Sequence, residues 1–84
     1  MADNTSTLPR YDAVLDTTGL YCPEPIMLMH NQVRDMSSGQ VLKVIATDPA
    51  TTRDVPKFCQ FLGHELLVQD SSSASDFVYF IRLA

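Results

Sequence analysis

The sequence has 84 residues, 45% hydrophobic and 19% charged, which is enough for one small globular domain and leaves no room for a second. Its formal charge is −4, from 6 basic and 10 acidic residues, and the basic residues form no cluster. Direct tight nucleic-acid binding is therefore not expected, because it relies on Lys and Arg that neutralise phosphates. The chain has neither a membrane-length apolar run nor a secretory signal at its start. We expect a cytoplasmic protein with no membrane partner.

The first half of the chain predicts a strand, a helix and a second strand. Residues 1–10 are polar and are expected to be a flexible segment that precedes a single domain at residues 11–84. Residues 11–16 alternate with a period of two, which is typical of a strand. Residues 23–36 predict a helix, and residues 41–47 predict a mostly buried strand. The apolar stripe of this helix is formed by Ile26, Met29, Val33 and Met36.

The second helix has an ambiguous start. Asp48 is placed to cap it with its carboxylate, and Pro49 fits the first helical position. A helix that ran unbroken from Pro49 would be kinked by Pro56, so the alternative is a regular helix that begins near Asp54. Gly63 ends the helix in either case. Its apolar stripe is formed by Val55, Phe58, Cys59 and Leu62.

Two more strands are predicted at residues 64–70 and 77–83, with a serine-rich turn between them. The complete order is β-α-β-α-β-β, which indicates a two-layer α/β (α+β) sandwich. The β-α-β crossovers are expected to be right-handed.

The run Cys22-Pro23-Glu24-Pro25 stands where the first helix starts. Cys22 is expected at the N-cap, and Pro23 and Pro25 lose no helical hydrogen bond in the first turn. Such a turn is stiff and would fix the direction of the sulfur. The helix N-terminus favours a thiolate while Glu24 disfavours it, so we expect the pKa of Cys22 to be lowered modestly. The alternative is an inert N-cap thiol.

The segment from Leu20 to Pro25 resembles the Cys-Pro-x-Pro signature of the TusA (SirA-like) sulfur carriers. The similarity continues through Asp48-Pro49-Ala50-Thr51-Thr52-Arg53-Asp54-Val55-Pro56 and extends from Leu15 to the last strand. One departure is Tyr21, which stands where the family often has a basic residue before the cysteine.

The resemblance implies a four-stranded mixed sheet with both helices on one face. It implies that Cys22 accepts persulfide sulfur from a cysteine desulfurase and passes it to a relay complex of the TusBCD type. The end product would be 2-thiouridine at the wobble position of certain tRNAs, although some family members serve other sulfur pathways. The chain would then be a sulfurtransferase-type carrier rather than an independent turnover enzyme, with no cofactor of its own.

The other thiol and the two histidines have simpler explanations. Cys59 lies on an apolar stripe, where a free cysteine behaves as a small core residue; a resolving thiol is the alternative. No zinc or other metal site is expected, because the two cysteines do not form a closely spaced pair. His30 would lie too far along the first helix to act as a base for Cys22, and His64 would need the fold to bring it near. Arg53 and Asp54 are expected to form a solvated charged surface.

Two rival functions remain open. A dithiol redox protein would pair Cys22 with Cys59 and would require their Cα atoms within about 7 Å. A regulatory binding module would need no thiol chemistry at all, so replacing Cys22 by serine would leave its function intact.

Overall fold

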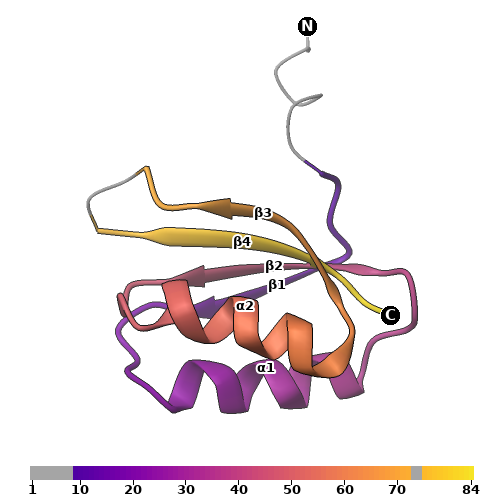
Figure 1. Cartoon of the computed structure of the whole chain (residues 1–84), viewed down its shortest axis with the longest axis horizontal. Helices are drawn as coiled ribbons and strands as arrows, with labels where there is room; N and C mark the ends of the chain where they lie inside the picture. The colour runs from indigo at the N-terminus through magenta and orange to yellow at the C-terminus, as the bar shows by residue number, and fades with distance from the viewer. Residues whose placement is uncertain (1–8, 73–74) are drawn as a thin grey trace, which may run out of the picture.

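The computed structural model describes residues 9–72 and 75–84, which form a four-stranded sheet with both helices on one face (Figure 1). The elements are β1 (Ala13–Thr17), α1 (Glu24–Arg34), β2 (Val41–Ala46), α2 (Thr51–Leu62), β3 (Glu65–Asp70) and β4 (Phe77–Arg82). The predicted element order and the two-layer α+β architecture are confirmed. The expected flexible segment falls mostly on residues 1–8, and part of the serine-rich turn falls on residues 73 and 74, all outside the described residues.

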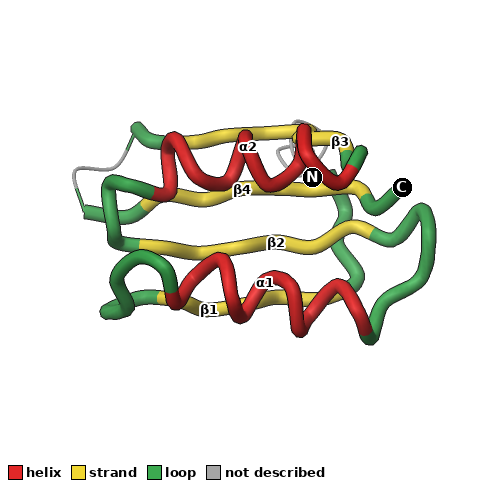
Figure 2. The backbone as a smooth tube through the Cα atoms, turned by 60° about the horizontal axis from the view of Figure 1, so that its bottom comes forward, coloured by secondary structure: helices red, strands yellow, loops and turns green. Residues whose placement is uncertain are grey.

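The sheet is mixed and has the strand order β1-β2-β4-β3 (Figure 2). β1 and β2 run parallel, as α1 crosses over between them, and β4 pairs antiparallel with both β2 and β3. The edge strand β3 contains an irregularity between Leu66 and Val68. Because β1 and β2 are parallel, the loops that follow them leave the sheet at the same end, where both strands finish. The starts of α1 and α2 therefore lie close together.

One face of the sheet is covered and the other is open. Along β2 the residues alternate between buried and half-buried, so the predicted strand has one fully covered face and one face that is only partly covered. A continuous apolar run looks the same in sequence whether one face or both are covered. On the open face the Lys43 ammonium lies 5.1 Å from the ring centroid of Tyr11 and 5.8 Å from that of Phe80. These contacts shield Phe80, which is buried although it lies on the open face of the sheet.

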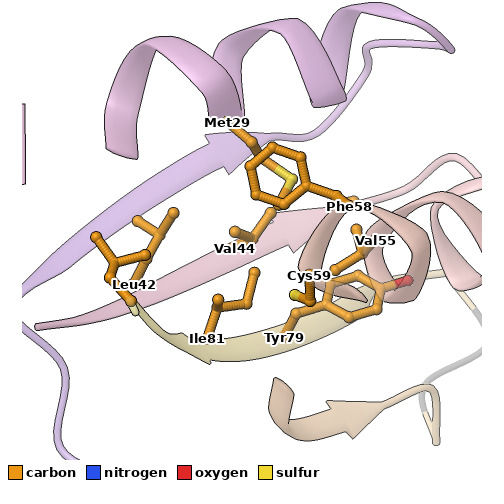
Figure 3. Close-up of a cluster of buried hydrophobic side chains, with 10 residues drawn as sticks. Met29, Leu42, Val44, Val55, Phe58, Cys59, Tyr79 and Ile81 are labelled. Atoms are coloured by element: carbon orange, nitrogen blue, oxygen red, sulfur yellow. The ribbon is translucent and has the colours of Figure 1, made fainter. Parts of the chain in front are cut away.

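The hydrophobic core lies between the helices and the sheet (Figure 3). Met29 of α1 is fully buried, and the three other residues predicted for the α1 stripe pack against the core. Val55, Phe58 and Cys59 of α2 are buried as predicted, but Leu62 is partly exposed. The fully buried core side chains contributed by the sheet include Leu42, Val44, Tyr79 and Ile81.

The start of α2 differs from both alternatives that the sequence offered. The helix begins at Thr51, its N-cap is Ala50, and Asp48 makes no side-chain cap. The segment enters the helix through a tight turn, in which the Thr51 N–H donates to the Asp48 carbonyl at 3.0 Å. Pro56 therefore lies inside the helix.

The structure shows how Pro56 is accommodated. A proline at this position cannot donate to the carbonyl of Thr52, one turn earlier in the helix. That carbonyl instead accepts a hydrogen bond of 3.2 Å from the Gln69 side chain of β3. The neighbouring strand thus supplies the donor that the proline lacks, which reduces the cost of the unpaired carbonyl.

Candidate functional site

Cys22 is exposed and lies in the loop between β1 and α1. The N-cap of α1 is Pro23 and not Cys22, so the predicted cap position was off by one residue. The reason is a tight turn before the helix, in which the Glu24 N–H donates to the Tyr21 carbonyl at 2.9 Å. Pro25 is buried within the first turn, and the Cys22–Pro23 peptide bond is cis.

Asp48 links this loop to the start of the second helix. Its Oδ2 accepts a 2.7 Å hydrogen bond from the main-chain N–H of Cys22, and its Oδ1 accepts a 3.1 Å bond from the N–H of Ala50. A second link lies close by, where the Gly19 N–H donates to the Thr47 hydroxyl at 2.9 Å. The carboxylate of Asp48, only 8% exposed as a residue, therefore holds the loop that carries the exposed thiol.

Two nearby carboxylates influence the pKa of the Cys22 thiol. The pKa of Cys22 is raised above its ordinary value, chiefly because the Asp54 carboxylate accepts a hydrogen bond from the thiol. Partial desolvation and the negative charges of Asp54 and Asp48 act in the same direction, while Arg53 opposes them. The expectation of a modestly lowered pKa was therefore wrong. The carboxylates responsible are Asp54 of α2 and Asp48, which precedes that helix, whereas Glu24, the carboxylate named from the sequence, is not among the causes.

Asp54 is also less solvated than the sequence indicated. Its side chain is 19% exposed and pairs with Arg53, whose Nε lies 3.3 Å from its Oδ1 and whose side chain is 65% exposed. The prediction of a solvated charged surface is correct for Arg53 alone. Asp54 faces the groove that also contains Cys22.

That groove lies between α1 and α2 and has a volume of about 790 Å³. Cys22 and Pro23 line it at the start of α1, and Phe61, which is 88% exposed, lines it on α2. The remaining lining residues are Ile26, His30, Asp54, Lys57, Phe58, Gln60 and Leu62. Tyr21, immediately before the cysteine, is 70% exposed. The thiol therefore stands beside an apolar hollow that has one cation, Lys57, and one carboxylate, Asp54, in its lining.

The histidines make other contacts. The ring of His30 meets Phe58 edge-on, with 4.8 Å between centroids, and His64 lies on another side of Phe58 at 5.9 Å. His64 Nδ1 accepts a 3.0 Å hydrogen bond from the Ala84 N–H, and partial burial lowers the pKa of His64. Neither contact makes a histidine the base for Cys22.

Cys59 belongs to the core, as the sequence predicted. It is 3% exposed, and burial raises the pKa of its thiol to about 11. Figure 3 shows its side chain among those of the core, close to Tyr79. Cys22 and Cys59 are both free thiols. A buried, protonated thiol is a poor partner for rapid disulfide exchange, so the arrangement does not favour the dithiol hypothesis.

Within residues 9–72 and 75–84, no three His, Cys, Asp or Glu side chains are grouped so that they could hold a metal ion. None of the helices among these residues is long and apolar enough to span a membrane.

Sequence reasoning missed the roles of Asp48 and Asp54 at the site. Asp48 was assigned to its own helix, whereas its partner Cys22 lies 26 residues away along the chain. The sequence did contain a sign of this contact, because two parallel strands joined by a crossover finish at the same end of the sheet. Cys22 and Asp48 each stand shortly after one of two such strands.

Comparison with known proteins assigns the family. The family described as Sulfurtransferase TusA matches residues 13–83. A sulfur carrier protein TusA from Pseudomonas paraeruginosa is 62% identical over 71 residues, which cover 84% of this chain and 89% of the relative. A sulfur carrier protein TusA from Pseudomonas putida is 63% identical over 71 residues, which cover 84% of this chain and 88% of the relative. The chain therefore belongs to the TusA family and is a sulfur carrier.

A solved structure supports the fold. The crystal structure of the SirA-like protein from Desulfitobacterium hafniense superposes with a TM-score of 0.73 and covers 84% of this chain and 96% of that one. Its sequence identity is 15%, so this likeness concerns the fold alone.

Proposed function

We propose that Cys22 is the residue that carries the sulfur, as a persulfide. The observation that supports this most directly is the exposed thiol beside the apolar groove, on a chain of the sulfur-carrier family. Pro23, Glu24 and Pro25 would shape the turn that presents it. The other thiol is buried and protonated, which leaves Cys22 as the accessible nucleophile among the described residues.

The transfer step resembles thiol–disulfide exchange. The Cys22 sulfur, once deprotonated, attacks the terminal sulfur of a persulfide on a donor cysteine. A new S–S bond forms at Cys22, the donor S–S bond breaks, and its electron pair leaves on the donor cysteine as a thiolate. That thiolate takes up a proton, so a thiol and a persulfide exchange places without net oxidation. In transfer to an acceptor, a thiolate of the acceptor attacks the terminal sulfur of the Cys22 persulfide, and Cys22 leaves as the thiolate.

The surroundings of the thiol suit a carrier that works in contact with other proteins. Tyr21 and Phe61 expose large aromatic surfaces near the groove, and aromatic residues are enriched where proteins bind each other. Because carboxylates disfavour the thiolate in the free protein, a partner would have to activate Cys22 by offering positive charge or by displacing Asp54.

The proposed pathway is supported by the resemblance to the family and not by the site. We propose that the donor is a cysteine desulfurase and the acceptor a relay complex of the TusBCD type. The sulfur would then reach the wobble uridine of certain tRNAs as 2-thiouridine, in the cytoplasm. Under this proposal the carrier is consumed and regenerated in each cycle and does not turn over a substrate alone.

The test is to incubate the reduced protein with a cysteine desulfurase and cysteine, and to map the product by mass spectrometry without reductant. We expect one added sulfur on Cys22, none in the Cys22→Ser variant, and unchanged loading in the matched control Cys59→Ala. Sulfur on Cys59, or none on the wild type while the desulfurase itself is loaded, would contradict the proposal. Detection of 2-thiouridine in tRNA of cells that contain or lack the carrier tests the pathway separately.

A further inference from the structure

The main-chain N–H of Cys22 needs a partner that its own helix cannot supply. The residue precedes α1, whose N-cap Pro23 forms no side-chain cap. The partner comes from the other helix start, where Asp48 Oδ2 accepts this N–H at 2.7 Å. A charged acceptor gives a shorter and stronger hydrogen bond than a neutral one.

Asp48 is itself held by three further hydrogen bonds. Its second carboxylate oxygen accepts the Ala50 N–H, and its carbonyl accepts both the N–H and the hydroxyl of Thr51, the latter at 2.7 Å. The Thr51 hydroxyl also lies 2.8 Å from the Tyr79 hydroxyl, within the core. A continuous series of hydrogen bonds thus runs from the central strand β4 to the nitrogen of Cys22.

This anchoring limits where the sulfur can go. With the nitrogen and Cα of Cys22 held, the main freedom left to the thiol is rotation about χ1, which has three staggered positions. Asp54 lines the same groove as Cys22, and its carboxylate disfavours the thiolate. The anchored main chain thus keeps the residue that carries the sulfur in the lining of the groove.

From this geometry we propose that Asp48 is a positioning residue for sulfur transfer: by holding the N–H of Cys22, it orients the sulfur toward a partner that docks on the groove. This inference rests on the proposed role of Cys22. It predicts that Asp48 matters for transfer between proteins, where orientation is constrained, and matters little for small donors that approach from any direction.

The experiment compares Asp48→Asn with the matched control Asp16→Asn. Asp16 makes a similar local bond, because its Oδ1 accepts the Thr18 N–H at 2.9 Å, but it is not among the residues that line the groove. An asparagine at position 48 cannot accept both N–H groups, since its amide nitrogen is a donor. Each variant is loaded from a cysteine desulfurase and, separately, from glutathione persulfide, and the rates are followed by mass spectrometry.

We expect Asp48→Asn to lower the rate from the desulfurase about tenfold and to leave the rate from glutathione persulfide unchanged or faster, because misplacement of a reacting group by about 1 Å can cost far more than this. The loss of charge should also move the pH profile of Cys22 alkylation toward lower pH. The Asp16→Asn control should load at the wild-type rate from both donors. Equal loss with both donors, or no loss with either, would overturn the inference.

Hydrogen exchange of the Cys22 amide, followed by NMR, keeps the two proposals distinguishable. The amide should be protected in the wild type and exposed in Asp48→Asn, whichever donor is used and even if Cys22 takes up no sulfur. A wild-type amide that exchanges freely would overturn the role of Asp48, whereas an unloaded wild type with a protected amide would count against the sulfur on Cys22 alone.

Discussion

The buried hydroxyl pair of Thr51 and Tyr79 offers a quantitative test of the connection between the core and the site. Thr51 is 1% exposed and its hydroxyl donates to the Asp48 carbonyl, so Tyr79 must donate the hydrogen that joins the two hydroxyls. Thr51→Val deletes both bonds and leaves the Tyr79 hydroxyl buried without a partner. We expect a loss of about 2 kcal/mol in the free energy of unfolding, because an unsatisfied buried donor costs about 1–3 kcal/mol.

Tyr79→Phe removes the hydroxyl itself, so it leaves no stranded donor and should cost about 1 kcal/mol. In the double variant Thr51→Val has only the Asp48 bond left to lose. The combined cost should therefore fall short of the sum of the single costs by about 1 kcal/mol. The matched control is Thr52→Val, because Thr52 is only half-buried and makes an equivalent but solvent-exposed 2.7 Å bond to the Pro49 carbonyl, so its loss should cost less than about 0.5 kcal/mol.

Urea unfolding followed by circular dichroism measures the wild type and all four variants. For a domain of this size a loss of about 2 kcal/mol corresponds to a fall in Tm on the order of 10 °C. Costs that add within about 0.3 kcal/mol would refute the reasoning, since they would mean that the two hydroxyls do not depend on each other.

Two further predictions concern Asp54 and Gln69. Asp54→Asn should lower the pKa of Cys22 and speed its alkylation by iodoacetamide at about pH 8, because the thiolate is the reactive form. The control Glu24→Gln should change neither the pKa nor the alkylation rate. An equal effect of both variants would contradict the role assigned to Asp54. Gln69→Glu should lower the free energy of unfolding by about 1 kcal/mol, because the carbonyl that the proline in α2 leaves free loses its donor. Gln60→Glu adds the same charge to an exposed position and is the control in urea unfolding, and equal losses would count against the bond.

The sequence was sufficient for the elements and for most of the core. Period-two alternation located the first and last strands, a compact apolar run located the second, and the helical spacing identified Met29 and Cys59 as core residues. These predictions succeed because the pattern of burial repeats along a strand or a helix and can be read locally. The cysteine was also found locally, from the prolines that follow it.

The cap position at Cys22 was missed because of a local turn, but the other features missed at the site arise where residues far apart in sequence meet. The bond from Cys22 to Asp48 and the negative surroundings of the thiol both depend on the parallel pairing of β1 with β2, which local patterns do not specify. The tolerance of Pro56 likewise depends on a side chain of β3. Local rules assigned Asp48 to a helix cap and left the start of α2 open because they count only the hydrogen bonds within one helix.

The irregular pairing in β3 has a consequence for how the protein behaves at high concentration. β1 and β3 form the edges of the sheet, and an unpaired edge is a template on which strands of other molecules can add. The register shift between Leu66 and Val68 interrupts the regular ladder on one edge, and β1 on the other edge has only 5 residues. Short and interrupted edges discourage aggregation through strand addition. The aromatic side chains beside the thiol can therefore stay exposed on the helical side of the protein. The sheet edges do not at the same time favour association with other copies of the chain.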